Sequence, residues 1–270
     1  MLLLLLVDIV GHLVASTDPK GLLQELAVLG TGLMALGSVN TKHFICFRDI
    51  PLLYGRVPKV ANSSIKAALC RLLETPQIEG MRTTSDNFWR TGTQGETSML
   101  STHDARMCRG THFSFSFVRN PFDRLVSAYN NKLLELEEIP GPMQAMGLVH
   151  SMPFGSFLDV VASTRDDRLD IHLLPQSKIL CLDGQLIPNF VGHLETMDED
   201  WSALQLQLRR ESLPNLGDLP EKNVRRRTDH RDVPSYFEDP SYVRIVIERY
   251  GEDLELFYGN KTTEQLVQGE

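Results

Sequence analysis

The feature that most constrains the fold of this chain is a recurring unit of an apolar segment of strand length, a short polar turn and an amphipathic helix. The first copy is Leu52–Val57 followed by Ile65–Leu73, where apolar residues recur at i, i+3, i+4, i+7 and i+8. The second begins at Phe113–Val118, which alternates like a strand, and the third at Phe190–Leu194. This order predicts an α/β fold with a short central parallel sheet flanked by helices.

Capping signals predict where three helices begin. Asn120 and Pro121 suit the N-cap and the first helical position. Thr196 with Glu199 has the pattern of a capping box, and Asp239 precedes the last long helix. The helix after Asn120 also carries a polar stripe apart from its apolar face, made of Asn120, Arg124, Ser127 and Asn131.

Two segments lack a clear periodic pattern. Residues 82–98 are rich in Thr, Ser and Gly, and Phe88 and Trp89 are their only large apolar groups, so we expect a mobile loop there. Residues 135–170 contain Pro140, several methionines and an amphipathic stretch, and they are the least regular part of the chain.

Length and composition favour a single domain. The chain has 270 residues, of which 42% are apolar and 23% charged, which excludes a disordered, collagen-like or polytopic membrane protein. We expect an apolar helical segment over residues 1–42, the main domain over 43–260 and a C-terminal tail over 261–270. The first segment lacks the basic start of a signal peptide, and Asp8 interrupts it as a membrane span, so we expect a helix pair or a membrane-surface contact.

The net charge and the spacing of the cysteines limit the classes of ligand that we expect this chain to bind. The formal net charge of −8 disfavours nucleic acid as a partner, so any bound anion needs a local cluster of cations. The cysteines contain no C-x-x-C pair, which predicts free thiols in a reducing compartment and no metal site. They are Cys46, Cys70, Cys108 and Cys181.

The turn between the first strand and its helix is a candidate anion site. The first turn of a helix directs backbone N–H groups at one point, and the helix dipole favours negative charge there. Lys59 adds a charge, Ser63 and Ser64 add hydroxyls, and Ala61 lets an anion approach. The alternative is an ordinary helix start with a surface lysine. The turn lacks the glycines of a nucleoside-triphosphate P-loop, which disfavours magnesium-dependent phosphoryl transfer, and no dinucleotide-binding glycine motif follows a strand.

A second candidate lies at the end of the second strand. Arg119 falls at the carboxyl edge of the predicted sheet, where open α/β sheets bind ligands. Ser127 follows two helical turns after Asn120 on the polar stripe, and an arginine with a hydroxyl suits a phosphate. The alternative is an arginine paired with a helix carboxylate such as Asp123.

Together these segments, VPKVANSSIK at residues 57–66 and FVRNPFDRLVSAY at 117–129, resemble the two cofactor motifs of sulfotransferases. The closest resemblance is to the membrane-type carbohydrate sulfotransferases, with the chondroitin, HNK-1 and heparan 2-O enzymes and their bacterial relatives. It extends to His172-x-x-Pro175-Gln176, to FVGHLET at 190–196 and to YGEDLELF at 250–257, and so covers roughly residues 50–258. Residues 43–260 would then be a sulfotransferase domain of P-loop-like topology.

The resemblance implies 3′-phosphoadenosine 5′-phosphosulfate as sulfate donor, a carbohydrate hydroxyl as acceptor and no metal. Lys59, the turn amides, Ser63 and Ser64 would hold the phosphosulfate with Arg56 close by. Arg119 and Ser127 would bind the 3′-phosphate. The full set of donor-binding residues that it implies is Arg56, Lys59, Val60, Ala61, Asn62, Ser63, Ser64, Arg119, Ser127, Arg225, Arg226 and Arg227.

Sulfuryl transfer needs charge stabilisation, which we expect from Lys59, and a base for the acceptor hydroxyl, commonly a histidine. His103 resembles a histidine segment that precedes the second motif in bacterial relatives and is the predicted base. His112 is the reserve candidate, and His172 is expected to be structural or to lie on the acceptor side. Residues 82–98 and 135–170 are expected to shape the acceptor pocket.

Two rival functions stay open at this point, a nucleotide kinase-like phosphotransferase and a non-catalytic nucleotide-binding relative. The animal enzymes carry a long N-terminal anchor and lumenal cysteines, which are missing or reduced here. We therefore expect a cytoplasmic location rather than Golgi anchoring, with peripheral membrane contact through residues 1–42 left open.

Overall fold

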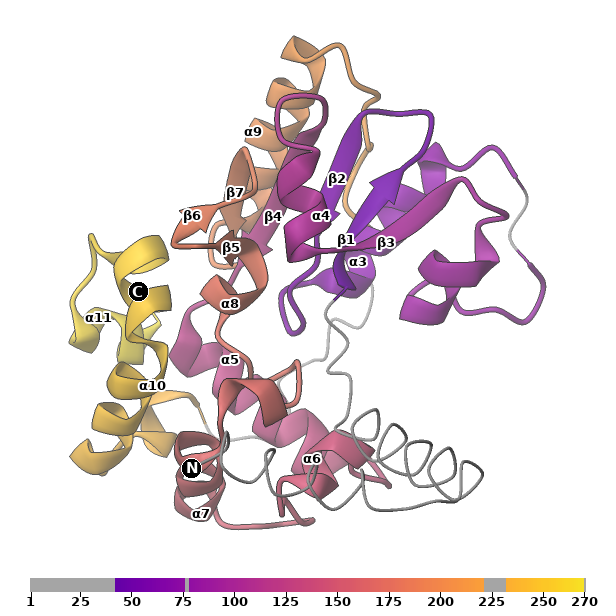
Figure 1. Cartoon of the computed structure of the whole chain (residues 1–270). Helices are drawn as coiled ribbons and strands as arrows, with labels where there is room; N and C mark the ends of the chain where they lie inside the picture. Colours follow the sequence, from indigo (N-terminus) through magenta and orange to yellow (C-terminus); the bar gives the residue numbers. More distant parts are fainter. Residues whose placement is uncertain (1–41, 76–77, 221–231, 270) are drawn as a thin grey trace, which may run out of the picture. The chain divides into compact units, whose positions relative to one another are not determined.

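The computed structural model describes residues 42–75, 78–220 and 232–269, and these residues belong to one compact unit. Its centre is a five-stranded sheet in the order β3-β1-β2-β4-β7 (Figure 1). The strands are β1 (Lys42–Phe47), β2 (Leu52–Gly55), β3 (Thr97–Ser101), β4 (Phe113–Val118) and β7 (Phe190–His193). The predicted α/β sulfotransferase-type architecture is confirmed, and the three predicted strands form its parallel part.

The parallel strands end together at one edge of the sheet. Gly55 of β2 pairs with Ser116 of β4, and Val118 pairs with His193 of β7. Phe115 and Phe117 of β4 are buried, and Phe117 packs against Trp201 with ring centroids 6.0 Å apart. Burial of both faces of this central strand fixes the register, because a one-residue slip would exchange its two faces.

The sheet is mixed rather than purely parallel. Strand β1 runs antiparallel to both β2 and β3, and neither β1 nor β3 was predicted. Residues 82–98, expected to be a mobile loop, hold a π-helical turn at Phe88–Gly92 and the start of β3. Trp89 explains the difference, since its buried ring meets Phe47 edge-on and its indole N–H donates to Thr83 O over 2.7 Å.

Helices cover the sheet and extend beyond its carboxyl edge (Figure 1). Helix α9 packs on β7, whereas α5, α7 and α10 pack on one another. The helices are α3 (Asn62–Leu69), α4 (Thr102–Met107), α5 (Pro121–Tyr129), α6 (Gly141–Ala145), α7 (Phe154–Ser163), α8 (Gln176–Leu180), α9 (Met197–Arg210), α10 (Pro240–Tyr258) and α11 (Thr263–Gln268). A small hairpin of β5 (Cys181–Leu182) and β6 (Gln185–Leu186) follows α8.

Two of the three capping predictions are confirmed. The Asn120 side chain accepts from Phe122 N over 3.1 Å, and Asp239 accepts from Ser241 N over 2.8 Å. The capping box at Thr196 does not form, because the Thr196 hydroxyl donates instead to Asp200 Oδ2 over 2.8 Å. That carboxylate also accepts from His193 N, so it ties β7 to α9.

The structure describes the C-terminal end of the chain almost completely and the N-terminal end only from Lys42. The expected tail, residues 261–270, contains α11, whose Leu266 and Val267 are buried. The apolar segment expected over 1–42 lies outside the described residues except for Lys42. Within the described part of the chain, no helix combines the length and apolar character that crossing a membrane requires. All four cysteines carry free thiols.

Candidate active site

The turn after β2 has an unusual backbone. Lys59 and Ala61 adopt positive φ values of 69° and 43°, and α3 begins at Asn62 with no side-chain cap from Ala61. Left-handed residues other than glycine are uncommon and cluster at ligand-binding turns. The amide end of α3 therefore faces the carboxyl edge of the sheet without a side-chain acceptor from its N-cap residue, which is the geometry expected of an anion site.

The Lys59 ammonium points along this edge toward the end of α5. Its Nζ donates to Asn131 Oδ1 over 3.1 Å, and Asn131 Nδ2 donates to Glu135 Oε2 over 3.3 Å. Asn131 lies in a π-helical turn, Asn130–Glu135, that continues α5. Single π turns inside helices are frequent at functional sites, and this one brings an amide of the polar stripe to the lysine.

Arg119 follows β4 and lies over the same turn. Its backbone is clamped by the Gln176 amide, which accepts from Arg119 N over 2.9 Å and donates to Arg119 O over 2.8 Å. Its guanidinium approaches Lys59 O at 3.4 Å and Asp123 Oδ1 at 3.8 Å. Both distances are long for a direct hydrogen bond. Ser127 lies two turns along α5 and is half-buried.

Arg124 ties three parts of the site together, and the sequence identified it only as a member of the polar stripe. Its guanidinium is buried and donates to Pro58 O over 3.1 Å, Leu174 O over 2.8 Å and Ile171 O over 3.3 Å. Burial lowers its pKa from the usual range of arginine, although the group stays charged. This single side chain fixes the Lys59 turn against the segment that carries His172.

His172 forms a dyad with a buried carboxylate. His172 Nδ1 lies 2.7 Å from Asp170 Oδ1, and the His172 N–H donates to the same oxygen over 2.8 Å. The ring is 25% exposed and Asp170 is 4% exposed. Burial lowers the pKa of His172, the charges of Lys132 and Lys59 lower it further, and Asp170 opposes them. A neutral imidazole with its proton on Nδ1 leaves Nε2 as a proton acceptor.

The other two histidines lie elsewhere. His103 follows β3, whose Ser101 pairs with Lys42, and β1 separates β3 from β2. Its ring is 73% exposed and lies 3.7 Å from the carboxylate of Asp104. His112 precedes β4 and therefore lies at the amino end of that strand, opposite Arg119. Of the three candidate histidines, His172 is the one whose segment Arg124 ties to the Lys59 turn.

Within the turn and the start of α3, Val60 and Ser64 are buried, Ser63 is half-buried, and Asn62 accepts from the Tyr54 hydroxyl over 3.2 Å. The other predicted donor ligands are Arg56 and three late arginines. Arg56 is buried and its Nη1 lies 3.0 Å from Asp86 Oδ2, which also pairs with the buried ammonium of Lys66. Arg56 thus lies behind the turn, where two cations share one carboxylate and leave a net positive field. Arg225, Arg226 and Arg227 fall outside the described residues. Across the described ranges, no group of three or more potential metal ligands is present.

Comparison with known proteins gives one match. A family model described as "Sulfotransferase family" matches residues 42–259 of the 270. No curated protein and no solved structure matches the chain. The match begins at β1 and ends just after α10, so it includes the Lys59 turn, Arg119 and His172. The chain therefore belongs to the sulfotransferase family, whose shared chemistry is sulfuryl transfer to an acceptor.

Proposed function

We propose that this protein transfers the sulfuryl group of 3′-phosphoadenosine 5′-phosphosulfate to a carbohydrate hydroxyl. The observation that carries the proposal is that the Arg124 guanidinium joins the Lys59 turn, through Pro58 O, to the segment of His172, through Ile171 O, while the Arg119 guanidinium approaches Lys59 O of the same turn. These residues belong to three separate stretches of the chain, and each has a distinct task in sulfuryl transfer.

The residues present fit a donor that carries two separated anionic groups. The left-handed turn at Lys59 and Ala61 and the start of α3 suit the 5′-phosphosulfate, and the positive field of Arg56 and Lys66 supports it. Arg119 and Ser127 suit the 3′-phosphate, because a guanidinium and a hydroxyl can both donate to it. The donor supplies the activated SO₃ group.

The chain's own residues then act on the transfer. Lys59 stabilises the negative charge that develops as the donor S–O bond breaks, and Asn131 orients the ammonium. The acceptor oxygen forms the new S–O bond, and its proton passes to Nε2 of His172. Asp170 holds the imidazole in the required tautomer and stabilises the cation that forms. In this proposal His172 takes the role that the sequence assigned to His103.

The test compares the two histidines. His172→Ala should lower kcat by ~10²–10⁴, the usual contribution of a positioned base, and leave the affinity for 3′-phosphoadenosine 5′-phosphate nearly unchanged. His103→Ala is the control and should retain kcat. If His103→Ala lowered kcat and His172→Ala retained it, the base would be His103.

The pH profile gives a second readout. A base must be neutral to accept a proton, so kcat falls as pH drops through its pKa. Because the pKa of His172 is lowered, the acidic limb should lie below about pH 6.5, the usual pKa of histidine. Loss of that limb in His172→Ala supports the assignment, and an unchanged limb in the residual activity contradicts it. Assays with ATP and magnesium should give no turnover, which separates this function from a kinase.

A further inference from the structure

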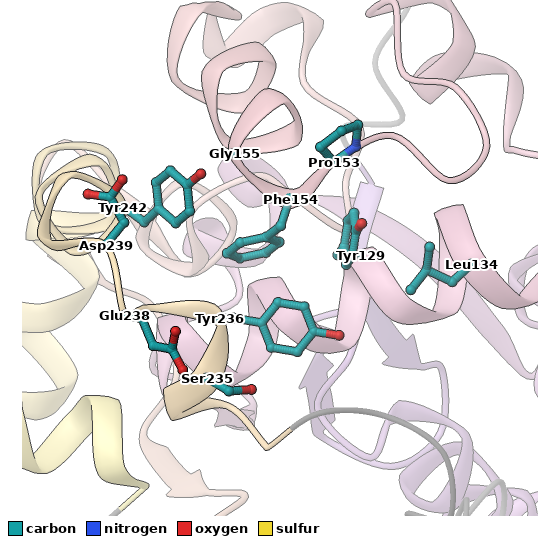
Figure 2. Close-up of a pocket in the computed structure, with 10 residues that line it drawn as sticks. All are labelled: Tyr129, Leu134, Pro153, Phe154, Gly155, Ser235, Tyr236, Glu238, Asp239 and Tyr242. Atoms are coloured by element: carbon teal, nitrogen blue, oxygen red, sulfur yellow. The ribbon is translucent and has the colours of Figure 1, made fainter.

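A cavity of about 550 Å³ lies beside the end of α5, and nothing described so far uses it. Its volume is within the range of small-molecule sites. It is lined by four aromatic rings, two carboxylates and four other residues, which come from the end of α5 and the turn after it, the start of α7, and the start of α10 with the segment that leads into it (Figure 2). The lining residues are Tyr129, Leu134, Pro153, Phe154, Gly155, Ser235, Tyr236, Glu238, Asp239 and Tyr242.

The aromatic wall is built and held in place. The ring of Phe154 lies 4.9 Å from that of Tyr236 and 5.2 Å from that of Tyr129, and both contacts are edge-to-face. Figure 2 shows the rings of Phe154, Tyr129 and Tyr236 grouped around one space, with Tyr242 on the α10 side. Gly155 is required there, because a Cβ at this position would collide with the Tyr242 hydroxyl.

The cavity is joined to the transfer site by two consecutive asparagines. The Tyr236 hydroxyl donates to Asn130 Oδ1 over 2.8 Å, and Asn131 accepts from Lys59 Nζ over 3.1 Å. Both asparagines lie in the π-helical turn Asn130–Glu135. A ligand held against Tyr236 therefore contacts the residue that bonds Asn130. The next residue of the same turn, Asn131, is the partner of the catalytic lysine.

The charge of the cavity selects its ligand. Glu238 and Asp239 are exposed at the rim, and an ionised carboxylate accepts hydrogen bonds but donates none. These oxygens suit the hydroxyl groups of a sugar, whose C–H faces pack on aromatic rings. They repel a uronate or a sulfate, because like charges brought together are unfavourable.

We propose that this cavity is an acceptor subsite for an uncharged hexopyranose unit, and that it discriminates against uronates. The inference rests on the proposed function, since it names the acceptor class of the same site. It assigns binding to Tyr242 and Tyr236 and charge selection to Glu238.

The experiment measures binding without turnover. The full chain is titrated, by ligand-observed NMR, with methyl β-glucoside and methyl β-galactoside and with the uronate counterpart of each. The uncharged member of at least one pair should saturate and bind roughly fivefold more tightly than its uronate. Equal or tighter binding of the uronates, or no saturable binding of either uncharged glycoside, overturns the subsite.

Three variants locate the binding. Tyr242→Ala should weaken the uncharged glycoside roughly 5- to 10-fold, and Tyr242→Phe, which retains the ring, should weaken it less than threefold. Glu238→Gln should reduce the preference over the uronate. Glu248→Gln, an exposed change on α10 outside the cavity, is the control and should leave that preference unchanged. Wild-type binding in all three test variants would place the sugar elsewhere.

A calorimetric titration of the same samples with 3′-phosphoadenosine 5′-phosphate separates the two proposals. Nucleotide binding without any discrimination between the glycosides rejects the subsite and leaves the sulfotransferase function standing. Absence of nucleotide binding rejects the proposed function, whatever the sugars do.

Discussion

The two strand-to-helix turns at the carboxyl edge of the sheet are built from the same type of unit and present different groups. After β2, the chain passes through two left-handed residues, Lys59 and Ala61, and α3 begins without a side-chain cap. After β4, Asn120 caps α5 with its own side chain, and Pro121 at the first helical position removes one N–H altogether. The first turn therefore presents the amide end of α3 without a side-chain cap, whereas at the second turn Asn120 accepts from one amide and Pro121 lacks another.

This difference assigns different work to the two turns. In the proposed function, backbone amides and Lys59 act at the reacting end of the donor, where charge changes during the reaction. In the same proposal Arg119 acts at a group that does not react, so it contributes binding. Arg124 keeps the turns in register, because it is part of α5 and donates to Pro58 O of the first turn.

Of the two turns, the first should give the larger effect when it is changed. Lys59→Ala should lower kcat by ~10²–10³, the scale of losing one pre-organised donor, because it removes the charge that stabilises the leaving group. Steady-state kinetics on the folded variant measure this, and affinity for the nucleotide product should change far less than kcat. If Lys59→Ala weakened nucleotide binding and left kcat unchanged, both turns would contribute binding and would not differ in function.

The buried His43, which lies close to the charge of Arg56, should make the free energy of unfolding depend on pH. Burial, followed by the charge of Arg56, lowers the pKa of His43 to about 4. The unfolded chain therefore binds more protons than the folded chain between about pH 6.5 and 4, so stability is lost as pH falls through this window. The loss amounts to about 3 kcal/mol at its lower end.

Urea unfolding at several pH values tests this, with His43→Gln compared against His103→Gln. The exposed ring of His103 makes it a matched control that should retain the wild-type slope. His43→Gln should flatten the slope below pH 6.5. Identical slopes in the two variants would show that His43 does not titrate in this window.

The second turn should respond in binding. Arg119→Ala should weaken binding of 3′-phosphoadenosine 5′-phosphate by ~1.5–3 kcal/mol, as for a hydrogen bond to a charged group. Binding of adenosine 5′-phosphosulfate, which lacks the 3′-phosphate, should weaken far less. Calorimetry with both ligands decides the matter, and equal losses would place Arg119 at the phosphosulfate instead.

The smallest effects concern the helix starts themselves. Asn120→Ala should lower the free energy of unfolding by ~0.5–2 kcal/mol, because it removes a cap and the bond from Asn120 Nδ2 to Leu266 O. Ala61→Gly should change it by less than about 0.5 kcal/mol, since relief of the left-handed backbone offsets the added chain entropy. Chemical denaturation compares them, and a large loss in Ala61→Gly would mean that this turn is not strained.

Local pattern predicted much of the fold and half of the candidate site. Strand β4 was predicted with the correct bounds, because the alternation of Phe and Ser has the two-residue period of a β-strand. Strands β1 and β3 were not predicted, since their pairing depends on Trp89 reaching Phe47 across the sheet edge. The predicted capping box at Thr196 does not form, because the Thr196 hydroxyl donates to Asp200 instead.

What the sequence alone determined are the features that a few neighbouring residues produce: the α/β order of elements, the Asn120-Pro121 helix start, and the two segments that mark a sulfotransferase. The tertiary structure decided which distant side chains meet. Lys59 and Asn131 are 72 residues apart, and Arg124 and Leu174 are 50 apart. Such contacts follow from packing and from the need of buried polar groups for partners, and no local pattern encodes them. For that reason the joining of the Asp170–His172 segment to the Lys59 turn, and the aromatic cavity, became visible only in the folded chain.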